Sequence, residues 1–289
     1  MTELPPDWPH REASASVTSG GLRWHVQQLG AGPALLLLHG TGASLHSWSG
    51  LLPLLAQSFR VLALDLPGHG FTEAPGAEGF SLPGMARSIA GLLQTLDFAP
   101  TLVLGHSAGA AVAARLCLDG AMAPAAIISL NGALEPFSGL QAQLFRPAAK
   151  LLSALSFVPA VVALQAQRPQ SVERMVASTG SSLSPEALDH YRHLVQMPGH
   201  VGAALKMMAN WDLATLHRDL PRLEPRLWLL VCSNDRAVPE AQARRLHRCL
   251  PRSRLRLLSG LGHLGHEEDP EQFRRLTCEI AVEEGVLPG

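Results

Sequence analysis

The sequence lacks an excess of charge of either sign and has no basic cluster. Its 289 residues include 23 Lys and Arg against 24 Asp and Glu, which gives a formal net charge of −1. Proteins that bind nucleic acid need clustered Lys and Arg side chains to contact the phosphates. The composition therefore argues against nucleic acid as the main partner.

Cysteine is also scarce. The four cysteines, Cys117, Cys232, Cys249 and Cys278, are scattered and form no C-x-x-C pair. We therefore expect neither a structural zinc site nor a disulfide framework, and a reducing cytoplasm fits best. The N-terminal residues MTELPPDWPHRE lack a charged start followed by an apolar core, so we predict no signal peptide.

No apolar run is long enough to cross a membrane. Residues 151–167 carry no charge, but they include Ser153, Ser156, Pro159 and two glutamines. A membrane-spanning helix needs about 20 predominantly apolar residues. We therefore predict no transmembrane span, and we leave shallow docking of this region on a membrane surface as an open alternative.

What the sequence does contain is an alternation of short apolar runs and helical patterns, with 47% apolar residues overall. Such an alternation predicts a mostly parallel sheet covered by helices on both faces. The strand-like runs end in Gly, His, Ser or Asp, where ligands of such sheets bind. Strand patterns occupy residues 22–30, 33–40, 61–70, 101–107, 125–132, 226–235 and 255–259, and helical patterns residues 45–57, 82–96, 107–119 and 239–249.

One region breaks this alternation. Residues 134–220 contain no strand-like run and are rich in Leu, Ala, Met, Gln and Pro with helical periodicity. We predict a core of residues 1–133 and 221–289, with residues 134–220 forming a helical lid inserted after the sixth strand.

A serine stands at the turn after one of the buried runs. Gly105, Ser107 and Gly109 form a G-x-S-x-G pattern between an apolar run and a helical pattern. A sharp strand-to-helix turn of this kind exposes a nucleophilic hydroxyl, and small residues on either side let the helix pass close to the strand. The alternative is a serine that merely caps the helix.

A serine nucleophile needs a base, and the base needs an orienting acid. Asp235 follows a strand-like run, and His263 lies in a glycine-rich loop before the last helix, so that the order is serine, acid, histidine. His266 competes with His263, but its acidic neighbours favour a role in packing or pairing at a helix start. The pattern predicts Ser107, Asp235 and His263 as a catalytic triad.

The loop after an early strand, in LLLLHGTGASLHSW, can supply an oxyanion hole. The backbone N–H of Thr41, with Gly42 beside it, and the N–H of Ala108 are the predicted donors. His39 is expected to make structural hydrogen bonds, and Asp65 is expected to hold the loop LDLPGHG in place.

The core motifs resemble the α/β-hydrolase superfamily. The resemblance implies a nucleophile at Ser107, an acid at Asp235, a base at His263, and oxyanion donors at Thr41 and Ala108. It rests on HGTGAS, LDLPGHG, GHSAGAA, SNDRAVP and GLGHLGHEEDP.

Two positions narrow this resemblance. Asn131 follows the run AAIISL, where some hydrolases place their acid, and this supports Asp235 in that role. Dehalogenases and epoxide hydrolases of this fold need a carboxylate nucleophile, whereas this chain has Ser107.

Further motifs resemble the magnesium-chelatase accessory proteins of bacteriochlorophyll biosynthesis. These motifs, GGLRWHVQ, LLLLHGTGASLHSW, LPGMA, LNGALEPF, STGSSL, ALKMMANWDL and GLGHLGHEE, include the predicted lid. The resemblance implies a part in photosynthetic pigment synthesis, with a porphyrin or a chelatase subunit as a partner. Flexible lid residues suit a large apolar guest, although they could equally pack the lid itself. The predicted substrate-binding set is Gly42, Trp48, His106, Met207, Met208 and Trp211.

Three functions stay open on the sequence. The first is a serine hydrolase acting on an ester or related acyl bond. The second is a non-catalytic accessory protein that binds a porphyrin or a chelatase subunit, and the third is a small-molecule esterase or carbon–carbon bond hydrolase of another pathway. The carboxylates do not cluster as Mg²⁺ ligands would, so we predict no metal site and no cofactor.

Overall fold

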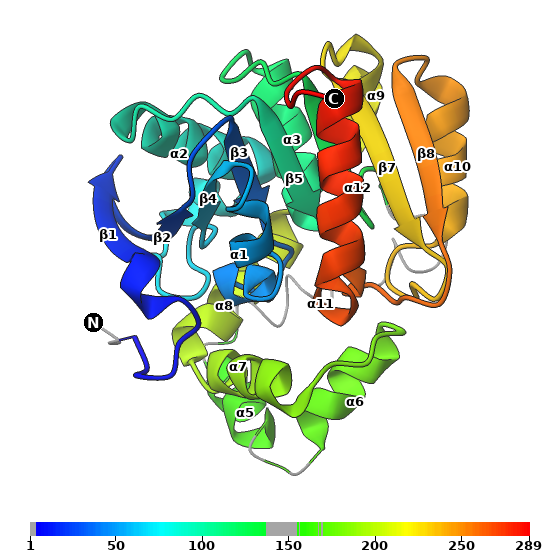
Figure 1. The fold of residues 1–289 in the computed structure, drawn as a ribbon. Helices are drawn as coiled ribbons and strands as arrows, with labels where there is room; N and C mark the ends of the chain where they lie inside the picture. The colour runs from blue at the N-terminus through cyan, green and yellow to red at the C-terminus, as the bar shows by residue number, and fades with distance from the viewer. Residues whose placement is uncertain (1–3, 137–154, 156, 167, 169) are drawn as a thin grey trace.

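The computed structural model describes residues 4–136, 155, 157–166, 168 and 170–289. Its centre is an eight-stranded sheet with the order β1-β2-β4-β3-β5-β6-β7-β8 (Figure 1). The pairs β1/β2 and β2/β4 are antiparallel, and all other neighbouring strands are parallel. The prediction of a mostly parallel sheet is confirmed.

The central strands are buried on both faces, as their continuous apolar sequences require. The sequence patterns did not predict one strand, β1. Its sequence SASVTS has a single large apolar residue, and the strand lies at the edge of the sheet. The strands are β1 (Ser14–Ser19), β2 (Leu22–Leu29), β3 (Ala34–Leu38), β4 (Arg60–Leu64), β5 (Leu102–His106), β6 (Ala126–Leu130), β7 (Arg226–Cys232) and β8 (Ser253–Leu258).

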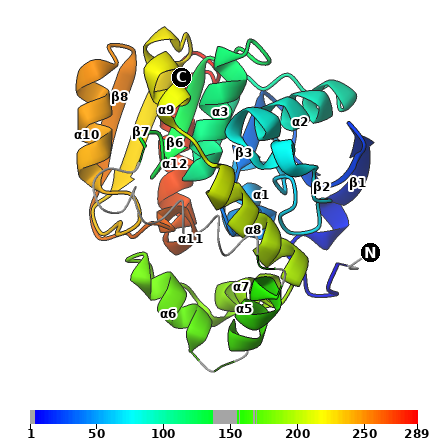
Figure 2. The ribbon, with the colours of Figure 1, turned by 180° about the vertical axis from the view of Figure 1, so that it is seen from behind.

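Helices cover both faces of the sheet and enclose two apolar cores. Within β3, Leu36 and Leu38 point into one core, and Leu35 and Leu37 point into the other. The first core lies under α2 (Leu82–Thr95), α3 (Ala108–Leu118), α9 (Ala214–Asp219) and α10 (Glu240–Cys249), as Figure 2 shows. The second lies under α1 (Leu52–Leu55) and α12 (Pro270–Glu283), which follows α11 (Gly265–Glu268). Short 3₁₀ turns occupy Arg11–Ala13, Ala77–Phe80 and Leu220–Arg222.

The helix expected over residues 45–57 is not continuous. A 3₁₀ turn covers Leu45–Trp48, and α1 begins only at Leu52. Pro53 stands in the first turn of α1, where its missing N–H does no harm, but further inside a helix it would break the hydrogen-bond ladder. The single-helix prediction was therefore wrong.

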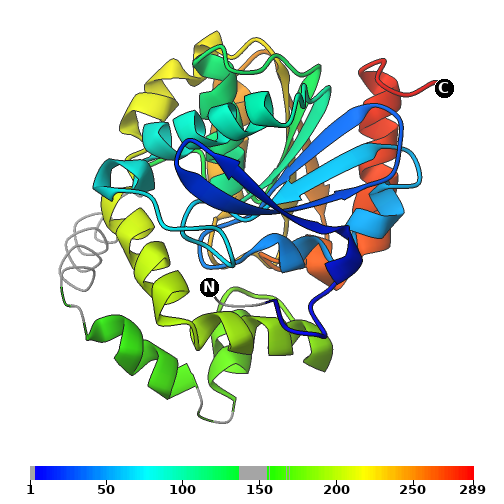
Figure 3. The ribbon, with the colours of Figure 1, turned by 90° about the vertical axis from the view of Figure 1, so that its left-hand side faces the viewer.

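Helices occupy the chain between β6 and β7. They are α5 (Val158–Ala166), α6 (Ser171–Ser178), α7 (Pro185–Val195), α8 (Pro198–Asn210) and α9, and the described residues of this segment contain no strand. Figure 3 shows α5 to α8 beyond one end of the sheet. We call residues 134–220 the helical insertion. Its predicted boundaries stay a prediction, and residues 137–154, 156, 167 and 169 lie outside the described part of the chain.

None of the described helices is both long enough and apolar enough to cross a bilayer.

A close backbone contact fixes the turn from β5 into α3. A Cβ atom added at Gly109 would lie 2.1 Å from the carbonyl oxygen of Leu38, and one added at Gly105 would lie 2.6 Å from the backbone of Ala110. Both positions therefore require glycine. This confirms the prediction that small residues let the helix pass close to the strand.

We expect Gly109→Ala to destabilise the protein by about 3 kcal/mol, because the added methyl group meets rigid backbone. Gly76→Ala is the matched control, since no atom lies within 4 Å of its added Cβ, and its effect should stay within about 0.5 kcal/mol. Urea unfolding measures both free energies. Equal stability of the two variants would contradict the close approach of α3 to the strand.

Candidate active site

A cavity of about 190 Å³ lies at the carboxyl ends of the central strands. It brings together the loop after β3, the turn after β5, the loop after β8 and two helices of the insertion. The cavity therefore gathers the predicted nucleophile, base and oxyanion loop. Its lining residues are Gly40, Thr41, Gly42, Ala43, His106, Ser107, Met175, Val176, Thr179, Tyr191, His263 and Leu264.

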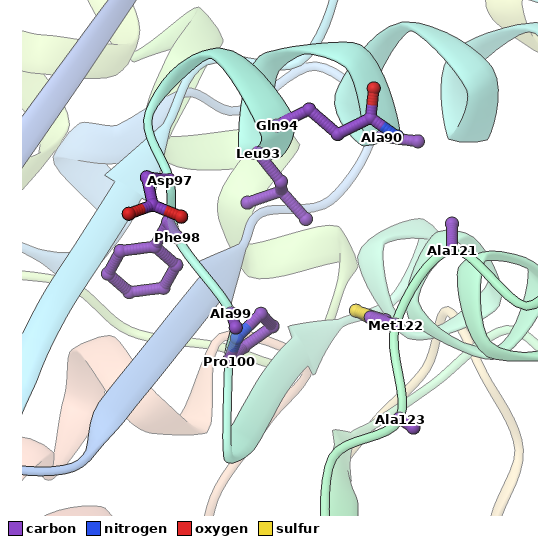
Figure 4. A pocket seen from close by; sticks show the side chains of 10 residues that line it. All are labelled: Ala90, Leu93, Gln94, Asp97, Phe98, Ala99, Pro100, Ala121, Met122 and Ala123. Atoms are coloured by element: carbon purple, nitrogen blue, oxygen red, sulfur yellow. The ribbon is translucent and has the colours of Figure 1, made fainter.

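A larger cavity of about 410 Å³ lies at the other end of the sheet, beside the residues that lead into β5 and β6 (Figure 4). Among the described residues, its only ionisable lining residue is Asp97, and the lining includes no Ser, Thr, Cys, His or Lys that could pair with this carboxylate. It is therefore not a candidate for nucleophilic catalysis. The lining residues are Ala90, Leu93, Gln94, Asp97, Phe98, Ala99, Pro100, Ala121, Met122 and Ala123.

Ser107 occupies a strained backbone conformation, with φ 50° and ψ −115°. Such a conformation costs on the order of 1–3 kcal/mol in a residue other than glycine, and it persists only where the surroundings impose it. Here the Ser107 N–H donates to the Leu130 carbonyl at 3.0 Å, and the Ser107 carbonyl accepts from the Ala133 N–H at 3.1 Å. The Ser107 side chain makes no capping hydrogen bond to α3, which removes support for the helix-cap alternative.

Asp235 and His263 form a hydrogen-bonded pair. The His263 Nδ1 lies 2.8 Å from Asp235 Oδ2, and Asp235 Oδ1 accepts from the N–H groups of Ala237 at 2.7 Å and Val238 at 2.9 Å. A carboxylate only accepts hydrogen bonds, so Nδ1 carries the hydrogen. The Nε2 atom is then left as the basic nitrogen of the imidazole.

Among the described residues, no hydrogen bond joins the Ser107 hydroxyl to His263, although both residues line the same cavity. Catalytic hydrogen bonds are often long or poorly aligned before a substrate binds. The contact between Asp235 and His263 is therefore formed, and the contact between Ser107 and His263 is open.

Of the predicted oxyanion donors, Thr41 lines the cavity, and Ala108 follows Ser107, which also lines it. Within the described part of the chain, the backbone N–H groups of Thr41 and Ala108 donate to no protein acceptor. The Thr41 hydroxyl instead donates to the Met207 Sδ at 3.4 Å, and His200 Nε2 donates to the Gly42 carbonyl at 3.1 Å. Helix α8 thus supports the loop and leaves the Thr41 amide hydrogen available.

His39 and Asp65 have the structural roles expected of them. His39 Nε2 accepts from the Leu66 N–H at 2.9 Å, and Nδ1 donates to the Gly40 carbonyl at 2.8 Å. Burial lowers the pKa of His39, which keeps the ring neutral. Asp65 accepts from the Phe71 N–H at 2.9 Å and thereby holds the LDLPGHG loop.

Two side chains that the sequence did not single out for this role hold the backbone of His263. Asn131 Nδ2 and His106 Nε2 donate to the His263 carbonyl at 2.9 Å and 3.0 Å. Asn131 also accepts from the Cys232 N–H at 2.8 Å, and its φ of 44° suits asparagine better than most residues. From the sequence, Asn131 was interpreted only as evidence against an acid at the alternative position after β6.

A turn of the insertion holds the same histidine loop. The Thr179 carbonyl accepts from the His263 N–H at 3.4 Å, and Ser181 Oγ accepts from the Leu264 N–H at 2.8 Å. Gly180 between them has a φ of 87° and lies against the loop that carries the acid. A glycine flanked by hydroxyl residues after a helical pattern was the signal in STGSSL that could have identified this turn.

The predicted substrate-binding residues divide into two groups. Gly42 and His106 line the cavity. Met207 is fully buried, and Met208 and Trp211 are partly buried outside the cavity lining. Trp48 lies in the second apolar core, where its ring packs 4.7 Å from the ring of His266, so it does not reach the cavity. Sequence periodicity could not show which face of its helical turn points inward.

The competing histidine, His266, is buried as expected. Its Nε2 lies 3.0 Å from Ser47 Oγ, and burial lowers its pKa to about 3. The neighbouring Glu267 accepts from the Tyr191 hydroxyl at 2.7 Å and from Ser47. Burial raises the pKa of Glu267 to about 7. Among the described residues, no group of three His, Cys, Asp or Glu side chains is arranged to hold a metal ion.

We expect Glu267→Gln to change how stability depends on pH. Because the pKa of Glu267 rises from 4.5 to about 7 on folding, the folded state keeps a proton that the unfolded chain releases between these values. Glu267 therefore contributes a loss of stability on the order of 3 kcal/mol as pH rises through this window, and the variant lacks this contribution. The buried histidines with lowered pKa values contribute the opposite pH dependence to both proteins, so the difference between wild type and variant isolates Glu267.

Urea unfolding at about pH 4.5 and about pH 8 measures this difference. The exposed Glu271→Gln serves as the control, and it should keep the wild-type pH dependence. Parallel pH profiles for wild type and Glu267→Gln would show that Glu267 is not buried in a protonated form.

The chain was compared with known proteins. The family described as "alpha/beta hydrolase fold" matches residues 33–270. The chain is 38% identical to the "Magnesium-chelatase 30 kDa subunit" of Rhodobacter capsulatus, over 91% of this chain and 93% of that protein. It is 30% identical to the pimeloyl-[acyl-carrier protein] methyl ester esterase of Aeromonas hydrophila, over 86% of this chain and 95% of that protein.

A solved structure agrees with these matches. The epoxide hydrolase CorEH aligns with a TM-score of 0.79 at 20% identity, covering 93% of this chain and 98% of that one. At that level of identity the likeness concerns the fold alone. The sequence matches, by contrast, span nearly the whole polypeptide, and the chain therefore belongs to the α/β-hydrolase family.

Proposed function

We propose that this protein is a serine hydrolase that cleaves an ester or a related acyl bond. One observation carries the proposal: the strained Ser107 turn and the His263 imidazole, paired with Asp235 at 2.8 Å, line a single cavity. A hydroxyl is a weak nucleophile until a neighbouring base accepts its proton, and this arrangement supplies that base.

The residues act in the following order in the proposed reaction. Ser107 Oγ attacks the carbonyl carbon while His263 Nε2 accepts the hydroxyl proton, and Asp235 stabilises the imidazolium that forms. The N–H groups of Thr41 and Ala108 donate to the oxyanion. His263 then gives the proton to the leaving alcohol, and a water molecule, activated by His263, hydrolyses the acyl-enzyme.

The nucleophile separates this chemistry from that of the fold neighbour. Epoxide opening in this fold uses a carboxylate nucleophile, and this chain has Ser107 in the turn. The relative that is named as a methyl ester esterase supports ester cleavage. A small-molecule esterase outside pigment synthesis is therefore one version of this proposal.

The physiological setting that we propose is bacteriochlorophyll biosynthesis at the magnesium-chelatase step, with a porphyrin or a chelatase subunit as partner. Support comes from the 38% identity to a protein named as a magnesium-chelatase subunit. A non-catalytic accessory role at the same step is the second candidate, because that name describes a subunit rather than a hydrolase. The two candidates differ in whether the pathway needs Ser107.

A fluorophosphonate probe should label the wild-type protein once, at Ser107. The variant Ser107→Ala should show no adduct, and His263→Ala should be labelled at least about 10³-fold more slowly because the hydroxyl loses its base. Ser178→Ala, an exposed serine of the insertion, is the control and should label normally. Intact-protein mass spectrometry reads out the adduct, and an unlabelled folded wild type would refute the hydrolase proposal.

Complementation separates the two candidate roles. In a pigment-producing bacterium lacking its own copy of this gene, wild type should restore bacteriochlorophyll and Ser107→Ala should not, if catalysis is needed. Immunoblotting controls for equal protein levels. Full restoration of bacteriochlorophyll by Ser107→Ala would support the accessory role and would contradict a catalytic role in this pathway.

A further inference from the structure

We propose that the cavity selects an uncharged, apolar group next to the scissile ester and rejects a substrate that carries a carboxylate at that place. The inference rests on the proposed hydrolase function and adds its substrate class. It follows from the chemistry of the cavity wall, from the hydrogen bonds that this wall has already formed, and from its volume.

Among the described residues, the wall of the cavity offers no charged counterpart for an anion. The lining contributed by this part of the chain includes no Asp, Glu, Lys or Arg. Ala43, Met175, Val176 and Leu264 supply an apolar surface. Burying a carboxylate against such a surface without a cation or several donors is strongly unfavourable.

Apart from the proposed nucleophile Ser107, the side-chain hydroxyl donors of the described wall are already occupied. The hydroxyl of Thr179 donates to the Val176 carbonyl at 2.7 Å, and that of Tyr191 donates to Glu267 at 2.7 Å. The Thr41 hydroxyl donates to the sulfur of Met207. None of these hydroxyl hydrogens is free for a substrate carboxylate.

His106 reinforces this preference. Its Nε2 donates to the His263 carbonyl, and its buried Nδ1 has no protein partner among the residues that the structure describes. Burial holds the pKa of His106 well below its ordinary value, so the ring is neutral and offers no positive charge to an anion. Glu267, which accepts from Tyr191, adds no positive charge either.

The cavity volume limits the group that can enter. An apolar cavity of about 150 Å³ holds benzene, so a cavity of about 190 Å³ holds a group of about eight non-hydrogen atoms. Met175, 44% exposed, is the most exposed residue of the lining and marks the opening. A larger substrate therefore places one small neutral end inside the cavity, and the rest of the substrate extends outward past Met175.

Two esters of the same shape test the charge preference. Mono-p-nitrophenyl succinate and p-nitrophenyl 4-methylpentanoate have acyl groups with equal numbers of non-hydrogen atoms. The acyl group of the first ends in a carboxylate, and that of the second ends in an isopropyl group. We expect kcat/KM for the succinate to be at least about 100-fold lower. Values within about threefold of each other would overturn the inference.

A cation introduced at the opening of the cavity should reduce the difference in kcat/KM between the two esters. Met175→Arg should narrow the ratio of the two kcat/KM values by at least about tenfold, because the guanidinium pairs with the substrate carboxylate. Leu164→Arg, which adds the same charge at an exposed position on α5 away from the cavity, is the matched control and should leave the ratio unchanged. Equal narrowing by both variants would show that net charge, and not the cavity wall, sets the preference.

The burst of p-nitrophenol reports acylation, so the comparison needs no complete turnover. If wild type releases p-nitrophenol from neither ester and takes up no fluorophosphonate, the hydrolase proposal itself fails. If it is labelled and is acylated equally by both esters, the hydrolase proposal stands and only the substrate inference fails.

Discussion

The site depends on how closely α3 approaches the sheet. Gly109 lets the helix pass within backbone contact of Leu38, and only then can the chain turn sharply enough to hold Ser107 at φ 50°. The same turn leaves the Ala108 N–H without an acceptor in the described part of the chain, at the start of a helix, where the helix dipole favours negative charge. One steric constraint thus positions both the proposed nucleophile and a proposed oxyanion donor.

The histidine is positioned from several parts of the fold. Asp235 contacts its ring, Asn131 and His106 hold its carbonyl, and Thr179 of the insertion accepts from its N–H. The helix that ends at this turn also supplies wall residues of the cavity. The insertion therefore shapes the cavity and supports His263 through the same short segment.

The titratable groups around the cavity are arranged to stay uncharged. Burial lowers the pKa values of His106 and His266 and raises that of Glu267 to about 7, so burial favours the neutral form of each. A neutral surrounding leaves the charge that develops on Ser107, His263 and the oxyanion as the dominant one. Among the described residues it also leaves an anionic substrate without a partner, which supports the proposed preference for a neutral ester.

The sequence by itself determined the features that depend on neighbouring residues. The buried strands, the glycine–serine–glycine turn and the role of His39 follow from patterns a few residues long, and the structure has them where they were expected. The edge strand β1, the break before Pro53, the inward face of Trp48 and the clamps at Asn131 and Thr179 could not be predicted in this way. They depend on which distant segments pack together, and only tertiary contacts decide which face is buried and which polar group finds a partner.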